Sequence, residues 1–146
     1  ISRELGIKTS EVLIVPCSES LKNELARYAT DNNLELQNIE SRGDFSTVET
    51  AQKKKNSFLC GLMDYIGGLE FNAVVIVGAN KDIFPKYSSY RSDHFTKYIA
   101  FNQLYVAITR AKYRLTFVVD KTKNVSELLN NAVEENLIDV IDTDKS

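Results

Sequence analysis

The sequence is poor in residues that bind metals or form disulfides. It contains one histidine, His94, and two cysteines, Cys17 and Cys60, which lie far apart with no Cys-x-x-Cys spacing. This is not the ligand set of a zinc site, and we expect no metal bound by the chain itself. Each cysteine lies in an apolar run, which favours buried free thiols over a disulfide. Free thiols are typical of a reducing compartment, so we expect a cytoplasmic protein.

Long apolar runs and a strong excess of charge are also missing. No apolar run approaches the ~18 residues of a membrane-spanning helix, and the first residues show no signal-peptide pattern. The formal net charge of −2 excludes a uniformly basic nucleic-acid coat protein. Any contact with nucleic acid must therefore be local. The chain does not begin with Met, so we interpret it as a piece of a longer protein or a processed one.

The chain is an ordinary globular one, with 43% hydrophobic and 26% charged residues in 146. We see no internal domain boundary and expect residues 1–146 to form a single domain. Glu11–Pro16 is a continuous apolar run typical of a strand buried on both faces. Leu21–Thr30 has the apolar spacing of an amphipathic helix with Ser18 or Ser20 as its N-cap, and Leu34–Ile39 alternates as a short exposed strand. Strand, helix and strand in this order favour an α/β layer.

The second half of the sequence continues this alternation. Phe58–Ile66 is predicted to be a buried strand running into a loop, and the β-branched run Phe71–Val77 a strand in the middle of a parallel sheet. Thr96–Arg110 is predicted to be a helix that leads into a buried strand over Leu115–Val119. The remaining predictions are Thr47–Gln52, a helix or a strand; Glu127–Asn136, a helix capped by Ser126; and Leu137–Ile141, a short final strand.

No complete catalytic site is visible in the sequence. It lacks the Gly-x-x-x-x-Gly-Lys-Ser/Thr loop that cradles phosphates, and no apolar strand ends in an Asp-Glu pair that would hold Mg²⁺. Two candidate features remain. Glu70 precedes a strand and needs a partner, which is either a salt bridge or the hydroxyl of a ligand. Arg110 lies with Lys112 and Arg114 at the predicted helix C-terminus, where the helix dipole favours cations, so a solvated helix end is the simple interpretation.

Three adjacent lysines, Lys53, Lys54 and Lys55, form a third candidate feature. Such a basic loop either is solvated or binds a phosphate backbone.

Two stretches resemble motifs of the UvrD/Rep-type superfamily I helicases. Gly67-Gly68-Leu69-Glu70-Phe71-Asn72-Ala73-Val74 is similar to their motif V, Lys-Gly-Leu-Glu-Phe-Asp-x-Val. Leu104–Lys112, which reads Leu-Tyr-Val-Ala-Ile-Thr-Arg-Ala-Lys, is similar to motif VI, Leu-Tyr-Val-Ala-Leu-Thr-Arg-Ala-Arg. The two stretches occur in the family's order, and the phrase Asn80–Pro85 between them is also similar. The resemblance extends over Phe58–Val119.

The resemblance implies a RecA-like three-layer α/β/α domain with a central, mainly parallel sheet, namely the C-terminal (2A) half of a helicase motor. Arg110 then matches the arginine finger, which stabilises charge on the transferring phosphoryl group of ATP. Glu70 matches a glutamate that contacts the nucleotide sugar, and Gly68 a glycine that lets the backbone approach the nucleotide. Asp64 occupies a position near the path of single-stranded DNA.

The implied activity is ATP-dependent translocation or unwinding of single-stranded or partly duplex DNA by the full-length protein. ATP and Mg²⁺ would be its cofactors and an N-terminal RecA-like domain its partner, and the isolated chain should be inactive. The sequence also departs from the family pattern. Leu62 stands where Thr is usual, Gly67 where Lys or Gln is usual, and Phe101-Asn102-Gln103 where basic residues are common. These departures leave an alternative, a degenerate non-catalytic module that binds protein or nucleic acid.

Overall fold

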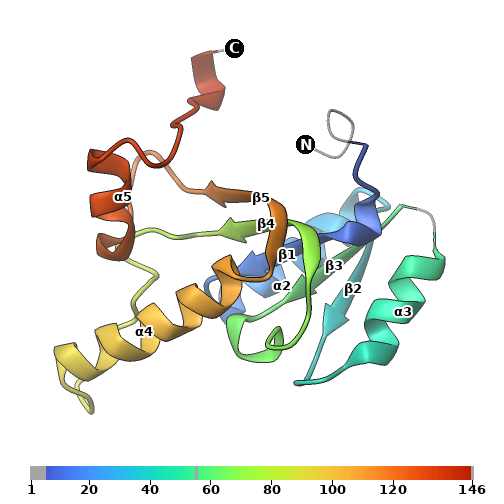
Figure 1. The fold of residues 1–146 in the computed structure, drawn as a ribbon, viewed down its shortest axis with the longest axis horizontal. Coiled ribbons are helices and arrows are strands. Elements are labelled where there is room, and N and C mark those ends of the chain that lie inside the picture. The colour runs from blue at the N-terminus through green and yellow to red at the C-terminus, as the bar shows by residue number, and fades with distance from the viewer. Residues whose placement is uncertain (1–5, 55, 146) are drawn as a thin grey trace.

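A five-stranded parallel sheet forms the centre of the molecule. The computed structural model describes residues 6–54 and 56–145, and the strand order is β2-β3-β1-β4-β5 (Figure 1). Every neighbouring pair in this sheet is parallel. The strands are β1 (Val12–Pro16), β2 (Glu35–Ile39), β3 (Ser57–Gly61), β4 (Phe71–Val77) and β5 (Ala111–Val118).

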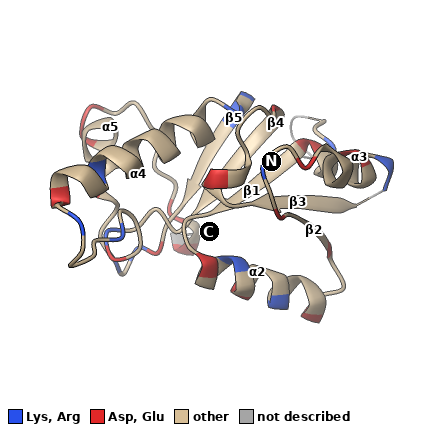
Figure 2. Ribbon diagram, turned by 90° about the horizontal axis from the view of Figure 1, so that it is seen from below, with Lys and Arg blue, Asp and Glu red and all other residues tan. Residues whose placement is uncertain are grey.

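Helices cover both faces of this sheet. Helix α2 (Glu19–Asp31) lies on one face, and α3 (Phe45–Lys53) and α4 (Asp93–Ile108) lie on the other (Figure 2). The predicted three-layer α/β/α architecture is therefore confirmed. The shorter helices are η1 (Thr9–Glu11), η2 (Met63–Tyr65), η3 (Glu127–Leu129), α5 (Asn130–Glu134) and η4 (Thr143–Lys145).

Strand β4 has the interior position that its apolar sequence predicted. It pairs with β1 on one side and β5 on the other. The side chains of Val74 and Ile76 are fully buried, as are Leu13 on β1 and Leu59 on β3. Burial of each such aliphatic side chain stabilises the fold by about 1.5–3 kcal/mol. An interior strand loses solvent on both faces, which is why all of its residues except Asn72 are apolar.

Side-chain caps decide where the three main helices begin. Ser18 Oγ accepts a hydrogen bond from the Leu21 backbone N–H at 3.2 Å, so Ser18 is the cap of α2. Asp44 caps α3 by accepting from the Thr47 N–H at 3.2 Å, which makes the ambiguous stretch 47–52 helical. Ser92 caps α4, and this helix begins at Asp93, before the predicted Thr96. Each cap satisfies a backbone donor that would otherwise lack a partner.

The end of α4 differs from the prediction. The helix ends at Ile108, and β5 already begins at Ala111, so Lys112 and Arg114 are strand residues and do not lie at the helix C-terminus. Pairing with β4 explains the early start, because the Phe71 N–H donates to the Arg110 carbonyl at 2.9 Å. Only Arg110 keeps the position at the helix end.

The C-terminal region also departs from the prediction. The expected helix over 127–136 is shorter, consisting of η3 and α5. Leu137–Ile141 forms no strand, and Leu137, Val140 and Ile141 are 72%, 77% and 81% exposed. Apolar alternation is not sufficient for a strand, since the segment also needs a neighbour to pair with. Among the described helices, none has the length and apolar character needed to cross a membrane.

Candidate functional site

Arg110 and the Gly68–Glu70 turn lie next to each other at one edge of the sheet. In a parallel sheet, the residues that precede each strand share an edge, here called the amino edge. Gly68 and Glu70 precede β4, Arg110 precedes β5, and these two strands pair with Phe71 opposite Ala111. In Figure 1, the green segment before β4 and the orange end of α4 reach the same side of the sheet. The fold thus joins the two sequence stretches that carry the helicase resemblance.

Arg110 is half-buried and bridges these two segments. Its Nη1 donates to the Leu69 carbonyl at 3.2 Å, across 41 residues of sequence. Its Nε donates to the Val106 carbonyl at 3.2 Å, and its Nη2 donates to Thr109 Oγ1 at 3.1 Å. The bond to Val106 places the cation on a carbonyl of the last helical turn, which also accepts from Thr109 Oγ1 and where the dipole favours positive charge. Three of the five N–H donors of the guanidinium are used, which leaves two for an anion.

Glu70 is an exposed residue with a cationic partner. Its carboxylate lies 3.3 Å from Lys112 Nζ, and the two side chains are 65% and 48% exposed. The structure therefore shows the salt bridge that was one of the two interpretations of Glu70. An exposed pair of this kind contributes only about 0–1 kcal/mol, so a ligand hydroxyl can displace it at little cost.

The backbone conformation at position 68 explains why this residue is a glycine. Its φ is +83°, in the left-handed region that side-chain-bearing residues avoid. A Cβ atom at Gly68 would meet no atom within 4 Å, so crowding by the rest of the chain does not require glycine here. The turn is also open on its outer side, which suits the approach of a second molecule.

The lysine cluster lies away from this site. Lys53 is the last residue of α3 and is exposed, and Lys54 forms an ion pair with Glu35. Both precede β3, so they share the amino edge with Arg110 but are separated from it by β1 and β4. Lys55 lies outside the described residues. The structure does not bring the lysines together with Gly68, Glu70 and Arg110.

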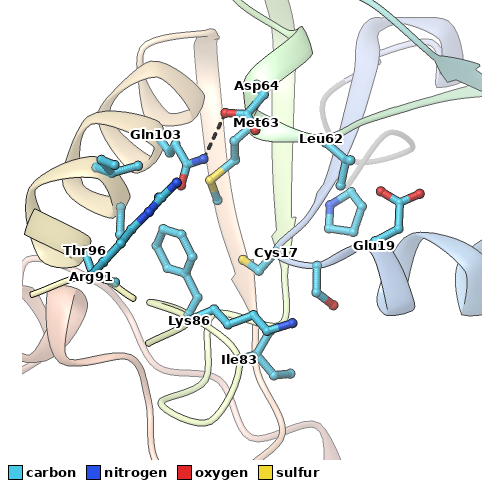
Figure 3. A pocket seen from close by; sticks show the side chains of 15 residues that line it. Cys17, Glu19, Leu62, Met63, Asp64, Ile83, Lys86, Arg91, Thr96 and Gln103 are labelled. Carbon is cyan, nitrogen blue, oxygen red and sulfur yellow. Dashed lines mark hydrogen bonds between the residues drawn. The ribbon is translucent and has the colours of Figure 1, made fainter. Parts of the chain in front are cut away.

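The opposite edge of the sheet, here called the carboxyl edge, contains a cavity of about 270 Å³. Segments that follow three different strands enclose it, and α4 closes one side (Figure 3). Ligand sites in parallel α/β sheets commonly lie at this edge. Its lining consists of Pro16–Glu19 after β1, Leu62–Asp64 after β3, Ile83, Phe84, Lys86 and Arg91 after β4, and Thr96, Ile99, Ala100 and Gln103 on α4.

Asp64 belongs to this cavity, away from the Arg110 site. Its Oδ1 accepts a hydrogen bond from Gln103 Nε2 at 2.9 Å (Figure 3). Its backbone carbonyl accepts one from Arg42 Nε at 2.8 Å. The carboxylate is therefore held against α4. Leu62, which replaces a hydroxyl-bearing residue of the family pattern, lines the same cavity. That position accordingly offers no side-chain hydrogen bond to a ligand.

The sequence did not assign two of the residues that line the cavity, Cys17 and Thr96, to any site. Cys17 is a half-buried free thiol, and burial raises its pKa to about 12. Thr96 is 8% exposed, and its Oγ1 has no hydrogen-bond partner among the described residues. The position of Cys17 just after β1 was a usable signal, because the carboxyl ends of strands line such cavities. No sequence signal pointed to Thr96.

Comparison with known proteins finds a similarity to one helicase family over part of the chain. Residues 65–122 match the family model of the UvrD-like helicase C-terminal domain. This segment is less than half of the chain, and over it the chain is similar to that family. The matched segment includes Gly68, Glu70 and Arg110, whereas Asp64 and the lysine cluster lie outside it.

One solved structure has a similar fold. The C-terminal domain of a possible DNA helicase from Lactobacillus plantarum WCFS1 aligns with a TM-score of 0.58 at 18% identity, over 88% of this chain and 64% of that one. At this identity, the likeness concerns the fold. The C-terminal part of the Fun30 ATPase domain aligns over 100% of this chain and 44% of that one, with a TM-score of 0.49 and 11% identity. The chain thus spans less than two thirds of either structure. No curated protein matches it.

Proposed function

We propose that this UvrD-like domain is the C-terminal motor half of an ATP-dependent superfamily I DNA helicase. In this proposal it supplies Arg110 to an ATP site shared with an N-terminal RecA-like domain and couples hydrolysis to movement on DNA. The observation that carries the proposal is the hydrogen bond from Arg110 to the Leu69 carbonyl, which holds the arginine beside Gly68 and Glu70. The match to the family over 65–122 supports it.

The chemistry of the three residues suits a nucleotide held by a second domain. The two remaining N–H donors of Arg110 would bind phosphate oxygens, and its fixed charge would stabilise the negative charge that develops during phosphoryl transfer. The Glu70 carboxylate would accept a hydrogen bond from the sugar in exchange for its exposed pair with Lys112. Gly68 would allow close approach because no side chain projects from the turn. ATP itself supplies the phosphoryl group.

The rest of the ATP site must come from outside this chain. The sequence has no phosphate-binding loop. Within residues 6–54 and 56–145, no group of three or more His, Cys, Asp or Glu could hold a metal ion. In our proposal the N-terminal domain therefore binds ATP and Mg²⁺, and the isolated chain does not hydrolyse ATP.

The test is Arg110→Ala in the full-length protein. We expect DNA-stimulated ATP hydrolysis to fall about 10³-fold or more, because the arginine finger stabilises the transition state. Arg27→Ala, at an exposed position on α2, is the control and should keep normal turnover. Near-normal turnover in Arg110→Ala would refute the assignment of the finger.

The alternative is a degenerate module that binds protein or nucleic acid without turnover. It is favoured by Leu62 and Gly67, which lack the side chains of the family pattern. An intact phosphate-binding loop upstream in the gene would support the motor, and its absence would support the module. The proposed DNA contacts at Asp64, Lys53, Lys54 and Lys55 are tested separately. Charge reversal of the lysines should weaken DNA binding and lower its salt dependence if they touch phosphates.

A further inference from the structure

The outer face of α4 carries a row of exposed aromatic side chains. Phe95, Tyr98, Phe101 and Tyr105 are 49%, 62%, 58% and 61% exposed. Their spacing of three, three and four residues places them on one side of the helix. We call this set the aromatic stripe. Single exposed apolar residues are common, but a contiguous row of rings on one helix marks an interaction surface.

The stripe is not part of the core of the domain. The inward face of α4 is formed by other residues, and Thr96, Ala100, Leu104 and Ala107 are all buried. With this face packed, the stripe is free to contact another molecule. The nature of that molecule is indicated by the charges around the stripe.

Negative charge is missing from the whole segment that contains the stripe. The chain has 20 acidic residues among 146, yet residues 94–119 contain neither Asp nor Glu. Figure 2 accordingly shows no red on α4 beyond its first turn. Such a gap favours a polyanionic partner, because no carboxylate along the helix would repel its phosphates.

Arginines lie at both ends of the stripe. The Arg91 guanidinium lies over the Phe95 ring, 5.8 Å from its centroid, and pairs with no carboxylate among the described residues. At the other end, Arg110 Nη2 bonds to Thr109, one turn after Tyr105. Lys97 is less available, because it forms an ion pair with Glu127 at 3.1 Å. The cations therefore bracket a row of rings.

We propose that the aromatic stripe of α4 binds single-stranded nucleic acid by stacking its bases, with Arg91 at one end contacting the phosphate backbone. Proteins that bind single strands without sequence preference combine aromatic platforms with flanking cations, because every base has a face that can stack. The inference deepens the proposed function and rests on it only in taking nucleic acid as the partner. None of the four rings belongs to the Gly68, Glu70 and Arg110 site, although the stripe ends one turn before Arg110.

The test uses the full-length protein, without nucleotide, and a fluorescent oligo-dT strand. Tyr98→Ala should weaken binding about fivefold or more, and Tyr98→Ala/Tyr105→Ala should weaken it further, because each ring removes a stacking contact. Tyr28→Ala is the matched control, since Tyr28 is also 62% exposed but lies on α2. It should leave the affinity unchanged.

Salt dependence separates the two kinds of contact. Arg91→Ala should reduce the slope of log K against log salt by about 0.7, the value for one phosphate contact with a single strand. Tyr98→Ala should leave that slope unchanged, because stacking releases no counterions. Photo-crosslinking with a bromodeoxyuridine strand should also yield adducts on the α4 peptide.

Equal affinities of Tyr98→Ala and Tyr28→Ala, together with no crosslink to α4, would overturn the proposal. Loss of ATP hydrolysis in Tyr98→Ala with unchanged nucleic-acid affinity would also overturn it and would assign the stripe to a protein partner. All binding measurements are made without nucleotide. Their outcome is therefore independent of whether Arg110 acts in hydrolysis.

Discussion

The two edges of the sheet differ in what they offer a ligand. At the amino edge, Gly68, Glu70 and Arg110 lie on an open surface and do not line the cavity of the opposite edge. At the carboxyl edge, the cavity of about 270 Å³ is present, but Leu62 lacks the hydroxyl of the family pattern and Asp64 is bound to Gln103. The motif residues of the amino edge do not line the cavity at the carboxyl edge, and the residues that line that cavity lack part of the motif.

This contrast is informative about how the domain works. An arginine on an open edge gains a low-dielectric environment only when another surface closes over it, which is what the proposed ATP site shared with a second domain would require. The carboxyl edge is shaped within the domain by segments that follow three of its strands. A half-site at one edge and a built cavity at the other predict different responses to substitution.

Two glycines with the same backbone angle provide the largest expected difference in stability. Gly78 follows β4 at the carboxyl edge and, like Gly68, has a φ of +83°. A Cβ atom at Gly78 would overlap Leu21 Cδ1. Gly78→Ala should therefore lower the free energy of unfolding by about 2–3 kcal/mol, mainly through backbone strain, with a smaller cost for moving the end of the Leu21 side chain. Urea unfolding measures this change, and a loss no larger than that of Gly68→Ala would contradict it.

At the amino edge, Gly68→Ala should have a smaller effect. Only strain at φ +83° acts there, since no atom lies within 4 Å of the added Cβ. We expect a loss of about 1–2 kcal/mol in the free energy of unfolding. Gly67→Ala is the control, because Gly67 has equally open surroundings without a positive φ. If the two variants unfold at the same urea concentration, backbone conformation is not the reason for glycine at 68.

Replacing Thr96 or Thr109, both in the α4 region, by valine should change the free energy of unfolding in opposite directions. Thr96→Val at the carboxyl edge removes a buried hydroxyl that has no partner among the described residues, so it should raise the free energy of unfolding by about 1 kcal/mol. Thr109→Val at the amino edge removes the hydrogen bonds of the Thr109 hydroxyl to the Tyr105 and Val106 carbonyls and to Arg110. This substitution should therefore lower the free energy of unfolding by about 1 kcal/mol. Destabilisation by Thr96→Val in thermal unfolding would show that its hydroxyl is satisfied in solution.

The smallest effect concerns the two thiols. Burial raises the pKa of Cys17 to about 12 and that of Cys60 to about 11. In the folded protein, iodoacetamide should modify Cys17 slowly, at a rate that still rises at pH 10, because little thiolate forms below its pKa. Cys60 is fully buried and should react only after unfolding. Mass spectrometry of the two peptides measures both rates, and a plateau for Cys17 near pH 9 would contradict the raised pKa.

The same pKa values predict a dependence of stability on pH. The neutral thiol is favoured in the folded state, so this contribution is fully present below the ordinary cysteine pKa of 9.0 and decreases as pH rises above it.

Local pattern was sufficient for much of the fold. The largely apolar run Phe71–Val77 predicted an interior strand with the observed bounds, because burial on both faces favours apolar residues at nearly every position. The helical spacing of Leu21–Thr30 and a nearby serine predicted α2 and its cap for similarly local reasons. The resemblance of two stretches to helicase motifs also indicated Gly68, Glu70 and Arg110 as candidate site residues.

Tertiary structure decided what these residues contact. The register of β5 against β4 moved Lys112 from a helix end into a strand, where it pairs with Glu70, and brought Arg110 to the Leu69 carbonyl. The carboxyl-edge cavity arises from segments far apart in sequence, so Thr96 could not be recognised from its neighbours. Periodicity and caps act within a few residues, whereas strand register and cavity shape depend on which distant segments meet. Sequence therefore determined the elements and the candidate residues, and only the packed sheet determined which of them share a site.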